Sequence, residues 1–316
     1  MGLRHRKSSG VKAVVCTAYG APEVLSVRDV PMPEPRHDEV RIRTIATTAH
    51  VGDTRIRRAD PFAARFAFGL FRPRPGLVLG LELAGVVDAV GSAVTTFVVG
   101  DEVMAFCGFG FGGNAEYRCL PVAAGNAQRL GAIVHKPASL SFEEAAAFPA
   151  GALTAHKNLQ KARLRAGQSI LINGASGSLG TYAIQNAKHL GTEVTAVCSS
   201  RNRELVEDLG ADAVIDYQSE DFTRLGPRFD VVYDAVALSS RRACRGLLRP
   251  GGVHVRNTGL STITRDDLQR LADLAATGVL RPVIDRTFSL EQVVEAHRYV
   301  DTGRKRGNVV LTAPTA

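Results

Sequence analysis

The stretch of residues 169–202, SILINGASGSLGTYAIQNAKHLGTEVTAVCSSRN, constrains the possible fold more than any other. An apolar run, three glycines at three-residue spacing, an amphipathic stretch and a second apolar run follow one another. In a strand–turn–helix–strand unit, glycines at Gly174, Gly177 and Gly180 permit a tight turn and a close backbone approach to a pyrophosphate, which the helix N-terminus stabilises. Glycine spacing alone is weak evidence, but this setting makes it specific. The stretch predicts a dinucleotide-binding βαβ unit.

The end of the second apolar run indicates which dinucleotide is bound. An NAD site usually places Asp or Glu there, where the carboxylate accepts from the ribose hydroxyls. This chain instead has Ser199, Ser200 and Arg201 after Cys198. Hydroxyl donors and a planar guanidinium suit a 2′-phosphate, so the sequence favours NADPH. The alternative is that Arg201 is only a solvated residue at the start of the next helix.

The middle of the chain alternates between strand and helix patterns from Ser141 onward. SFEEAAAF begins with a capping box of Ser141 and Glu144, and Pro149 with Gly151 is expected to end that short helix. The βα units that follow predict a doubly wound parallel sheet.

The two ends of the chain have a different pattern. Residues 11–125 show period-two alternation with frequent Gly, Pro and Asp, which predicts a small β barrel or sandwich. Beyond Asp285, a capping box of Ser289 and Gln292 begins an amphipathic helix that Gly303 ends. The final apolar strand, NVVLT, could return to the N-terminal β-rich part and make that domain discontinuous.

Composition excludes several classes of protein. No apolar stretch approaches the roughly 20 residues that span a bilayer, so we expect no membrane partner and a cytoplasmic protein. The net charge of +8 is spread along the chain without a nucleic-acid-binding motif, so we expect no nucleic acid partner. The five cysteines are scattered and include no CxxC, which argues against a disulfide framework or a thiolate metal cluster.

Several motifs in fixed order resemble the zinc-independent quinone oxidoreductase branch of the medium-chain dehydrogenase/reductases. They are GASGSLG with its flanks, GLELAGVVDAVGSAV, AEYRCLP and LRPVIDRTFSLEQVVEAHRYVDTGRKRGNVVL. The resemblance implies a Rossmann doubly wound parallel sheet domain plus a discontinuous GroES-like β-rich domain, with NADPH between them. The implied boundaries are a flexible basic tail at 1–10, the GroES-like domain at 11–130 and 285–316, and the Rossmann domain at 131–284.

The resemblance also bears on metal chemistry. At the three zinc-ligand positions of the related alcohol dehydrogenases stand His50, Leu81 and Ala150, with Glu82 following Leu81. One ligand of three does not hold a tetrahedral zinc, so we expect no metal site.

Site residues follow partly from the glycine turn and partly from the resemblance. The candidate catalytic residues are His50, Asp53 and Thr154. The resemblance implies that relatives usually carry Asn at the position of His50. A packing role for His50 and capping roles for Asp53 and Thr154 stay open. The candidate cofactor-binding residues are Gly174, Ser176, Gly177, Ser178, Leu179, Gly180, Ser199, Ser200, Arg201, Tyr217 and Asn308. Tyr217 could simply pack, and Asn308 replaces a lysine of the relatives.

A phenylalanine-rich segment, PFAARFAFGLFRPRPG, follows the first candidate residues. Its four phenylalanines, Phe62, Phe66, Phe68 and Phe71, could form an apolar wall for a substrate. The interpretation that we favour is an amphipathic segment packed on the core.

The chain departs from the family in two further places. Ala237 stands in DAVALSS where relatives have a glycine that lets the backbone approach the cofactor. Near residues 258–266 the Rossmann part is shortened, so that the sixth sheet strand is expected to be missing. Because that end of the sheet commonly forms the dimer, a homodimer is doubtful.

These features together predict an NADPH-dependent oxidoreductase that transfers hydride to quinones or α,β-unsaturated carbonyl compounds without zinc. Conjugate addition delocalises charge over the acceptor and needs less polarisation by a Lewis acid. Two alternatives stay open: an enoyl-thioester reductase, and a non-catalytic NADPH-binding regulatory paralogue.

Overall fold

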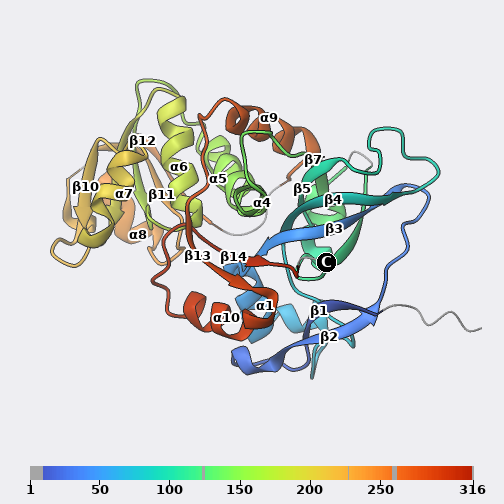
Figure 1. Ribbon diagram of the computed structural model, residues 1–316. Helices are drawn as coiled ribbons and strands as arrows, with labels where there is room; N and C mark the ends of the chain where they lie inside the picture. The colour runs from blue at the N-terminus through green and yellow to red at the C-terminus, as the bar shows by residue number, and fades with distance from the viewer. Residues whose placement is uncertain (1–9, 123–124, 227, 258–261, 315–316) are drawn as a thin grey trace, which may run out of the picture.

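The computed structural model describes residues 10–122, 125–226, 228–257 and 262–314 and contains a parallel sheet, a larger mixed sheet and a hairpin (Figure 1). The parallel sheet has five strands among these residues. In spatial order they are β10 (Ala213–Asp216), β9 (Glu193–Cys198), β8 (Ser169–Asn173), β11 (Phe229–Asp234) and β12 (Leu248–Arg256). This order and direction confirm the doubly wound sheet.

Strand β8 shows why this sheet is buried on both faces. Ile170 and Ile172 pack into the cluster that includes helices α5 (Pro149–Ala162) and α6 (Ser178–His189), whereas Leu171 packs into a second cluster on the other face. All three side chains have no exposed surface. Continuous apolar runs suit such strands, since helices cover both faces of a parallel sheet.

The mixed sheet joins the two ends of the chain. Its spatial order is β13 (Ile284–Ser289), β14 (Asn308–Thr312), β3 (Glu39–Thr48), β4 (Glu82–Val90), β5 (Glu102–Phe106) and β7 (Ala132–His135), with β6 (Tyr117–Pro121) also paired to β3. The C-terminal strand β14 is antiparallel to β3, with Val310 opposite Thr48. Strands β1 (Gly10–Cys16) and β2 (Leu25–Pro31) form the hairpin. The exact domain boundaries stay a prediction.

The remaining helices are short. They are α1 (Val51–Arg58), α2 (Ala64–Phe68), α3 (Ala127–Leu130), α4 (Phe142–Ala146), α7 (Arg203–Asp208), α8 (Arg241–Cys244), α9 (Arg265–Ala276) and α10 (Val293–Asp301). Single 3₁₀ turns cover Pro22–Val24, Gly108–Gly110, Ser200–Asn202, Phe222–Arg224, Arg245–Leu247 and Leu290–Gln292. Both capping boxes, at Ser141 and at Ser289, are present. All five cysteines are buried free thiols.

The short helix α4 ends at Ala146, before Pro149 as expected, whereas the expectation that Gly151 ends a helix is wrong. Pro149 is the first residue of α5, a position where its missing N–H is not needed. A Cβ on Gly151 would lie 2.6 Å from the Ser178 Oγ and 2.7 Å from the Tyr182 ring. Gly151 therefore serves the close packing of α5 on α6 and does not act as a helix breaker.

The shortened part of the Rossmann sheet falls partly outside the described residues, because 258–261 are among those left out. The described chain resumes at Thr262, and α9 begins at Arg265. Within the described chain, β12 is therefore an edge strand of the parallel sheet. Its exposed Arg249 and Pro250 are residue types that discourage pairing with another strand.

The backbone at Ala237 has φ 58°, in the left-handed region that favours glycine. Because a Cβ is strained there, we expect Ala237→Gly to raise the free energy of unfolding by about 0.5–1 kcal/mol. Ala235→Gly is the matched control. Ala235 is buried and does not have a positive φ, so its replacement by glycine should lower the free energy of unfolding. Urea denaturation measures both variants, and a destabilising Ala237→Gly would contradict the strain.

His297 on α10 is fully buried, and within the described chain neither ring nitrogen has a hydrogen-bond partner. Burial, with Arg57 nearby, lowers the pKa of His297 to about 3. The unfolded histidine binds a proton below pH 6.5, so the native state loses stability as the pH falls from 6.5 toward 3.

We therefore expect His297→Leu to stabilise the protein, and its advantage over the wild type to grow by about 2 kcal/mol between pH 8 and pH 5. Denaturant unfolding at the two pH values measures this difference. The control is His189→Leu at an exposed histidine, which should keep the wild-type pH dependence. An advantage of His297→Leu that is independent of pH would contradict a buried neutral imidazole.

Candidate functional site

The glycine turn lies between β8 and α6, as the sequence predicts. Gly174 has φ 78°, and a Cβ on Gly180 would lie 2.3 Å from the Gly174 carbonyl oxygen. These two glycines are therefore needed for the turn itself and for the close approach of α6. At Gly177 a Cβ would meet only the Gly174 oxygen, at 3.4 Å.

The start of α6 suits a bound anion. Gly177 is its N-cap residue, and no side chain caps the helix. The buried Ser178 hydroxyl also has no hydrogen-bond partner in the described chain. Uncapped first-turn amides with an orphaned hydroxyl beside them fit the pyrophosphate of a dinucleotide. Leu179, also predicted for this site, is half-buried in the same turn.

The C-terminal segment 304–307 meets this turn, which sequence reasoning missed. The Gly307 N–H donates to the Ser176 carbonyl at 2.8 Å, and Gly177 and Gly307 form an isolated parallel β-bridge. The Arg201 guanidinium donates to the Arg304 carbonyl at 2.9 Å. The start of the last strand and the adenosine end of the predicted site are thus neighbours.

The residues after β9 differ in their exposure. Ser199 is buried, whereas Ser200 and Arg201 are exposed. Asn202 was missed: its amide donates to the Ser176 hydroxyl at 2.9 Å and to the Ser199 hydroxyl at 3.3 Å, while its buried Oδ1 has no partner in the described chain. Asn202 therefore links the end of β9 to the glycine turn and retains a free acceptor.

Two neighbouring strands add residues at the same end of the sheet. Asp216 on β10 stands opposite Cys198 and accepts from the Gln218 N–H, so a carboxylate lies closer to the end of β9 than the sequence suggested. Tyr217 is 56% exposed, so its ring is not part of the buried core. Asn308 is 2% exposed and donates to the Val283 carbonyl at 3.1 Å, so its amide group holds the sheet.

His50 and Asp53 form a capping box at the start of α1. The Asp53 carboxylate accepts from the His50 N–H at 3.1 Å and from the Gly80 N–H at 3.0 Å, and it has no exposed surface. Burial raises the pKa of Asp53 to about 7. Both oxygens have backbone partners, which gives Asp53 the capping role that its position in the sequence left open.

The protonation of His50 follows from its partner. Its Nδ1 accepts from the Gly52 N–H at 2.9 Å, so the ring proton must lie on Nε2. Desolvation, with the charges of Lys305 and Arg55 nearby, lowers the pKa of His50 to about 3. His50 is therefore a neutral hydrogen-bond donor at Nε2.

Glu82 is a buried carboxylate that sequence reasoning left without a role. It accepts from the Thr48 hydroxyl and from the Ala150 N–H, each at 2.7 Å. Burial raises the pKa of Glu82 to about 7. The half-buried Lys305 lies near enough to act on the pKa of Glu82 and of His50, and desolvation lowers its own pKa to about 8.

Thr154 lies inside α5 and is half-buried, so the helix-capping alternative for it is wrong.

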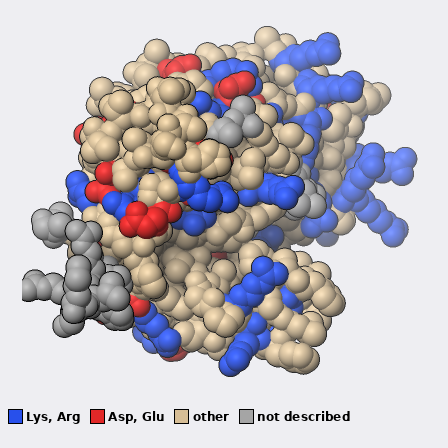
Figure 2. All heavy atoms as spheres, turned by 90° about the vertical axis from the view of Figure 1, so that its right-hand side faces the viewer, with Lys and Arg blue, Asp and Glu red and all other residues tan. Residues whose placement is uncertain are grey.

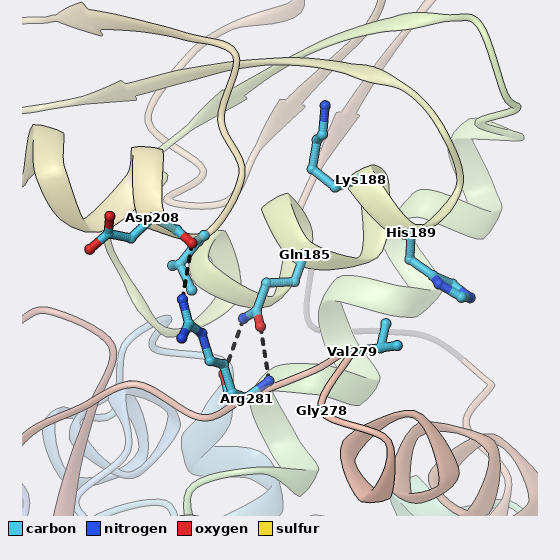
Figure 3. A pocket seen from close by; sticks show the side chains of 8 residues that line it. Gln185, Lys188, His189, Asp208, Gly278, Val279 and Arg281 are labelled. Carbon is cyan, nitrogen blue, oxygen red and sulfur yellow. Dashed lines mark hydrogen bonds between the residues drawn. The ribbon is translucent and has the colours of Figure 1, made fainter.

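A pocket lined by Gln185, Lys188, His189 and Arg281 lies along the C-terminal half of α6, away from the glycine turn (Figure 3). The Gln185 side chain donates to the Arg281 carbonyl and accepts from the Arg281 N–H. Gln185 therefore links α6 to the backbone at Arg281, and both polar atoms of its amide have a protein partner.

The phenylalanine-rich segment does not pack on the core as favoured. Phe68 alone of the four turns inward, where its ring meets Phe111 edge-on at 5.5 Å. Phe62, Phe66 and Phe71 are 63%, 74% and 87% exposed. The amphipathic-core interpretation is therefore wrong for these three.

Comparison with known proteins agrees with this architecture. Residues 36–133 match the family model of the alcohol dehydrogenase GroES-like domain, and residues 178–276 and 254–311 match two models of zinc-binding dehydrogenases. The chain is 36% identical over 324 residues to a 2-methylene-furan-3-one reductase of Solanum lycopersicum, covering 96% of this chain and 79% of the relative. It is 33% identical over 341 residues to a quinone oxidoreductase of Pseudomonas aeruginosa, covering 95% and 99%.

The chain belongs to the quinone oxidoreductase-like medium-chain dehydrogenase/reductases. A solved quinone oxidoreductase from Coxiella burnetii is similar with a TM-score of 0.81 at 29% identity, covering 96% of this chain and 99% of that one. The GroES-like and Rossmann architecture expected from the sequence is thereby confirmed. Among the described residues, no helix has the length and apolar character needed to cross a bilayer.

Proposed function

We propose that the protein is an oxidoreductase that uses NADPH to reduce quinones or α,β-unsaturated carbonyl compounds without zinc. The observation that carries this proposal is that one chain combines an uncapped glycine turn with His50, Leu81 and Ala150 at the positions where the resemblance places the zinc ligands. Across the described ranges, no group of three or more His, Cys, Asp or Glu side chains is arranged to bind a metal ion. The names of the relatives support a nicotinamide-dependent reduction.

The chain would hold the cofactor by three kinds of contact. The first-turn amides of α6 would bind the pyrophosphate, and Ser178 would add a hydroxyl donor. The Arg201 fork, with Ser199 and Ser200, would bind the 2′-phosphate. NADPH supplies the hydride when it is bound, and the protein contributes orientation and electrostatics.

The acceptor end would be served by neutral groups and one cation. His50 donates from Nε2 and stays uncharged across the physiological range, since its pKa is about 3. Lys305, with its pKa lowered to about 8, can release a proton near neutral pH. Conjugate hydride addition needs one proton for the resulting enolate or hydroquinone anion, and Lys305 or water provides it.

The direct test mixes the purified protein with NADPH and a panel of quinones, enones and an enoyl thioester, and follows NADPH oxidation. We expect turnover with quinones or enones and no loss after treatment with a chelator. Activity lost to the chelator and restored by zinc would overturn the metal-free proposal. NADPH binding without oxidation by any acceptor would favour a regulatory paralogue, and a preference for the thioester would favour the enoyl reductase.

Substitution of His50 tests its role as a neutral donor. Because asparagine supplies both an N-cap acceptor and an amide donor, we expect His50→Asn to keep turnover within about threefold, whereas His50→Ala loses about 10- to 100-fold. The measurement is steady-state kcat and KM with one quinone from pH 5 to 8. The neutral imidazole would be contradicted if the wild-type rate changed with the titration of one group between pH 5 and 8 and this pH dependence were absent in His50→Asn.

A further inference from the structure

The segment of residues 61–76 exposes a group of large apolar side chains that the proposed reaction does not use. Phe62, Phe66, Leu70 and Phe71 are 63%, 74%, 45% and 87% exposed. Phe62 and Phe66 meet edge to face with their ring centroids 6.5 Å apart. Scattered single apolar residues are normal on a surface, but four within ten residues form a patch that indicates a binding surface.

This patch is held in place by the rest of the domain. The Tyr19 hydroxyl donates to the Gly69 carbonyl at 2.7 Å, and the Arg74 N–H donates to the Phe68 carbonyl at 2.8 Å. The Arg65 guanidinium lies over the Tyr19 ring at 4.8 Å and over the Phe62 ring at 5.1 Å. Together with the inward ring of Phe68, these contacts fix the exposed rings on a folded support.

The charged residues within this segment are all basic, whereas the exposed Asp60 directly precedes it. Residues 61–81 include Arg65, Arg72 and Arg74 and no Asp or Glu. Arg72 and Arg74 are exposed beside Phe71. The face of the molecule in Figure 2 shows more Lys and Arg than Asp and Glu, in keeping with the net charge of +8.

We propose that residues 61–76 dock the protein onto an anionic lipid surface. Aromatic and aliphatic side chains that enter the headgroup region, flanked by arginines that attract acidic headgroups, are the elements of peripheral membrane binding. A second copy of the chain fits less well, because a symmetric interface would bring the arginines of both copies together without an acidic residue of this segment to pair them. Peripheral docking requires no spanning helix.

The test is co-sedimentation of the full chain with vesicles of phosphatidylcholine alone or with about 30% phosphatidylglycerol. We expect binding to the anionic vesicles that weakens at high salt. Phe66→Ser/Phe71→Ser should lower the partition coefficient at least about tenfold, and Arg72→Gln/Arg74→Gln should reduce binding to the level on neutral vesicles. Thermal unfolding checks that each variant is folded.

Matched controls lie outside the segment. Leu238 is 86% exposed, and the Arg224 side chain, which is paired with Asp221, is 87% exposed. Leu238→Ser and Arg224→Gln therefore remove an exposed apolar side chain and an exposed basic side chain elsewhere and should leave binding unchanged. The vesicle assay needs neither cofactor nor acceptor, which makes its outcome independent of the proposed reductase activity.

Three outcomes would overturn the proposal. The first is a wild-type protein that stays in solution with anionic vesicles at low salt. The second is a dimer in sedimentation velocity that Phe66→Ser/Phe71→Ser dissociates, with no vesicle binding, which would assign the patch to a second copy. The third is a loss of turnover of a water-soluble quinone in that variant without vesicles, which would assign the rings to the substrate site.

Discussion

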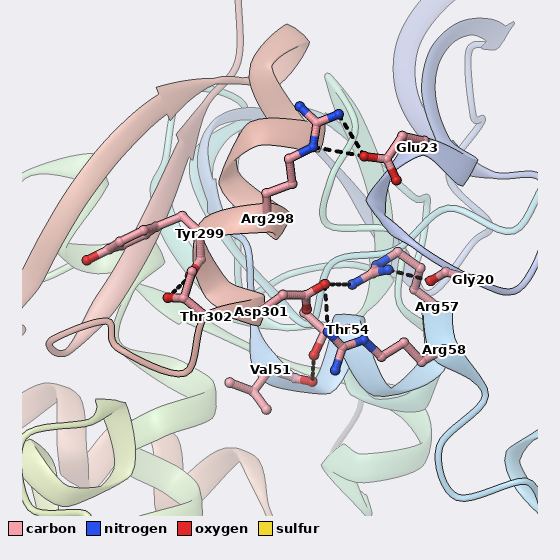
Figure 4. Close-up of polar contacts among 10 residues, drawn as sticks. All are labelled: Gly20, Glu23, Val51, Thr54, Arg57, Arg58, Arg298, Tyr299, Asp301 and Thr302. Carbon is pink, nitrogen blue, oxygen red and sulfur yellow. Dashed lines mark hydrogen bonds and ion pairs between the residues drawn. The ribbon is translucent and has the colours of Figure 1, made fainter.

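Replacing Arg57 with methionine is expected to lower the free energy of unfolding by about 3 kcal/mol. The Arg57 side chain has no exposed surface and joins α1 to α10 (Figure 4). Its guanidinium donates to the Gly20 carbonyl and to the Asp301 carboxylate, the latter at 2.6 Å. Removal of a buried charge leaves its partners unsatisfied, and Asp301 is only 14% exposed.

Arg58 offers a matched control on the same carboxylate. It lies 2.7 Å from Asp301 but is 47% exposed, so water screens the pair and can replace it. We expect Arg58→Met to cost less than about 1 kcal/mol. Urea denaturation followed by circular dichroism measures both variants at neutral pH. Equal costs for the two would show that burial of Arg57 does not determine the strength of this contact.

Replacing Arg201 with alanine is expected to weaken NADPH binding about 10- to 100-fold while changing NADH binding little. Within the cofactor, the Arg201 guanidinium would contact only the 2′-phosphate, a group that NADH lacks. The Arg304 carbonyl, which accepts from Arg201 at 2.9 Å, holds the fork beside the glycine turn. The change in NADPH or NADH fluorescence as protein is added gives the dissociation constant of each cofactor.

Arg203, two residues further on, is the control for a general loss of positive charge. Its guanidinium is bound to the Glu207 carboxylate at 3.2 Å and to the Val214 carbonyl at 3.3 Å. We expect Arg203→Ala to leave the preference for NADPH over NADH in place. Equal losses of NADPH and NADH in Arg201→Ala would refute the phosphate pocket and would direct attention to Asp216 as a ribose partner.

The elements that local rules govern could be predicted from the sequence. The capping boxes at Ser141 and Ser289, and the strand–turn–helix order around Gly177, depend on residues within a few positions of one another. The same local reasoning failed at Gly151, because this residue lies inside α5 and serves the packing of that helix on α6. It failed again at Phe66 and its neighbours, because helical spacing does not show which face of a segment meets the core.

The contacts that complete the candidate site join residues far apart in the chain. Glu82 accepts from Ala150, and Gly307 donates to Ser176. Outside the site, Arg57 likewise pairs with Asp301 across 244 positions. No motif spacing encodes such pairs, since each depends on how the two sheets and α10 come together. The sequence by itself determined the glycine turn and the serines and Arg201 after it, because these are matters of residue type and short spacing.

Only the tertiary structure decided the state of the ionisable groups. Burial raises the pKa of Asp53 and Glu82 to about 7 and lowers the pKa of His50 to about 3. Desolvation depends on the atoms that surround a group in the folded protein, most of which come from distant segments. The residue types therefore named the candidates for the chemistry, and the packing around them determined the charge that each one carries.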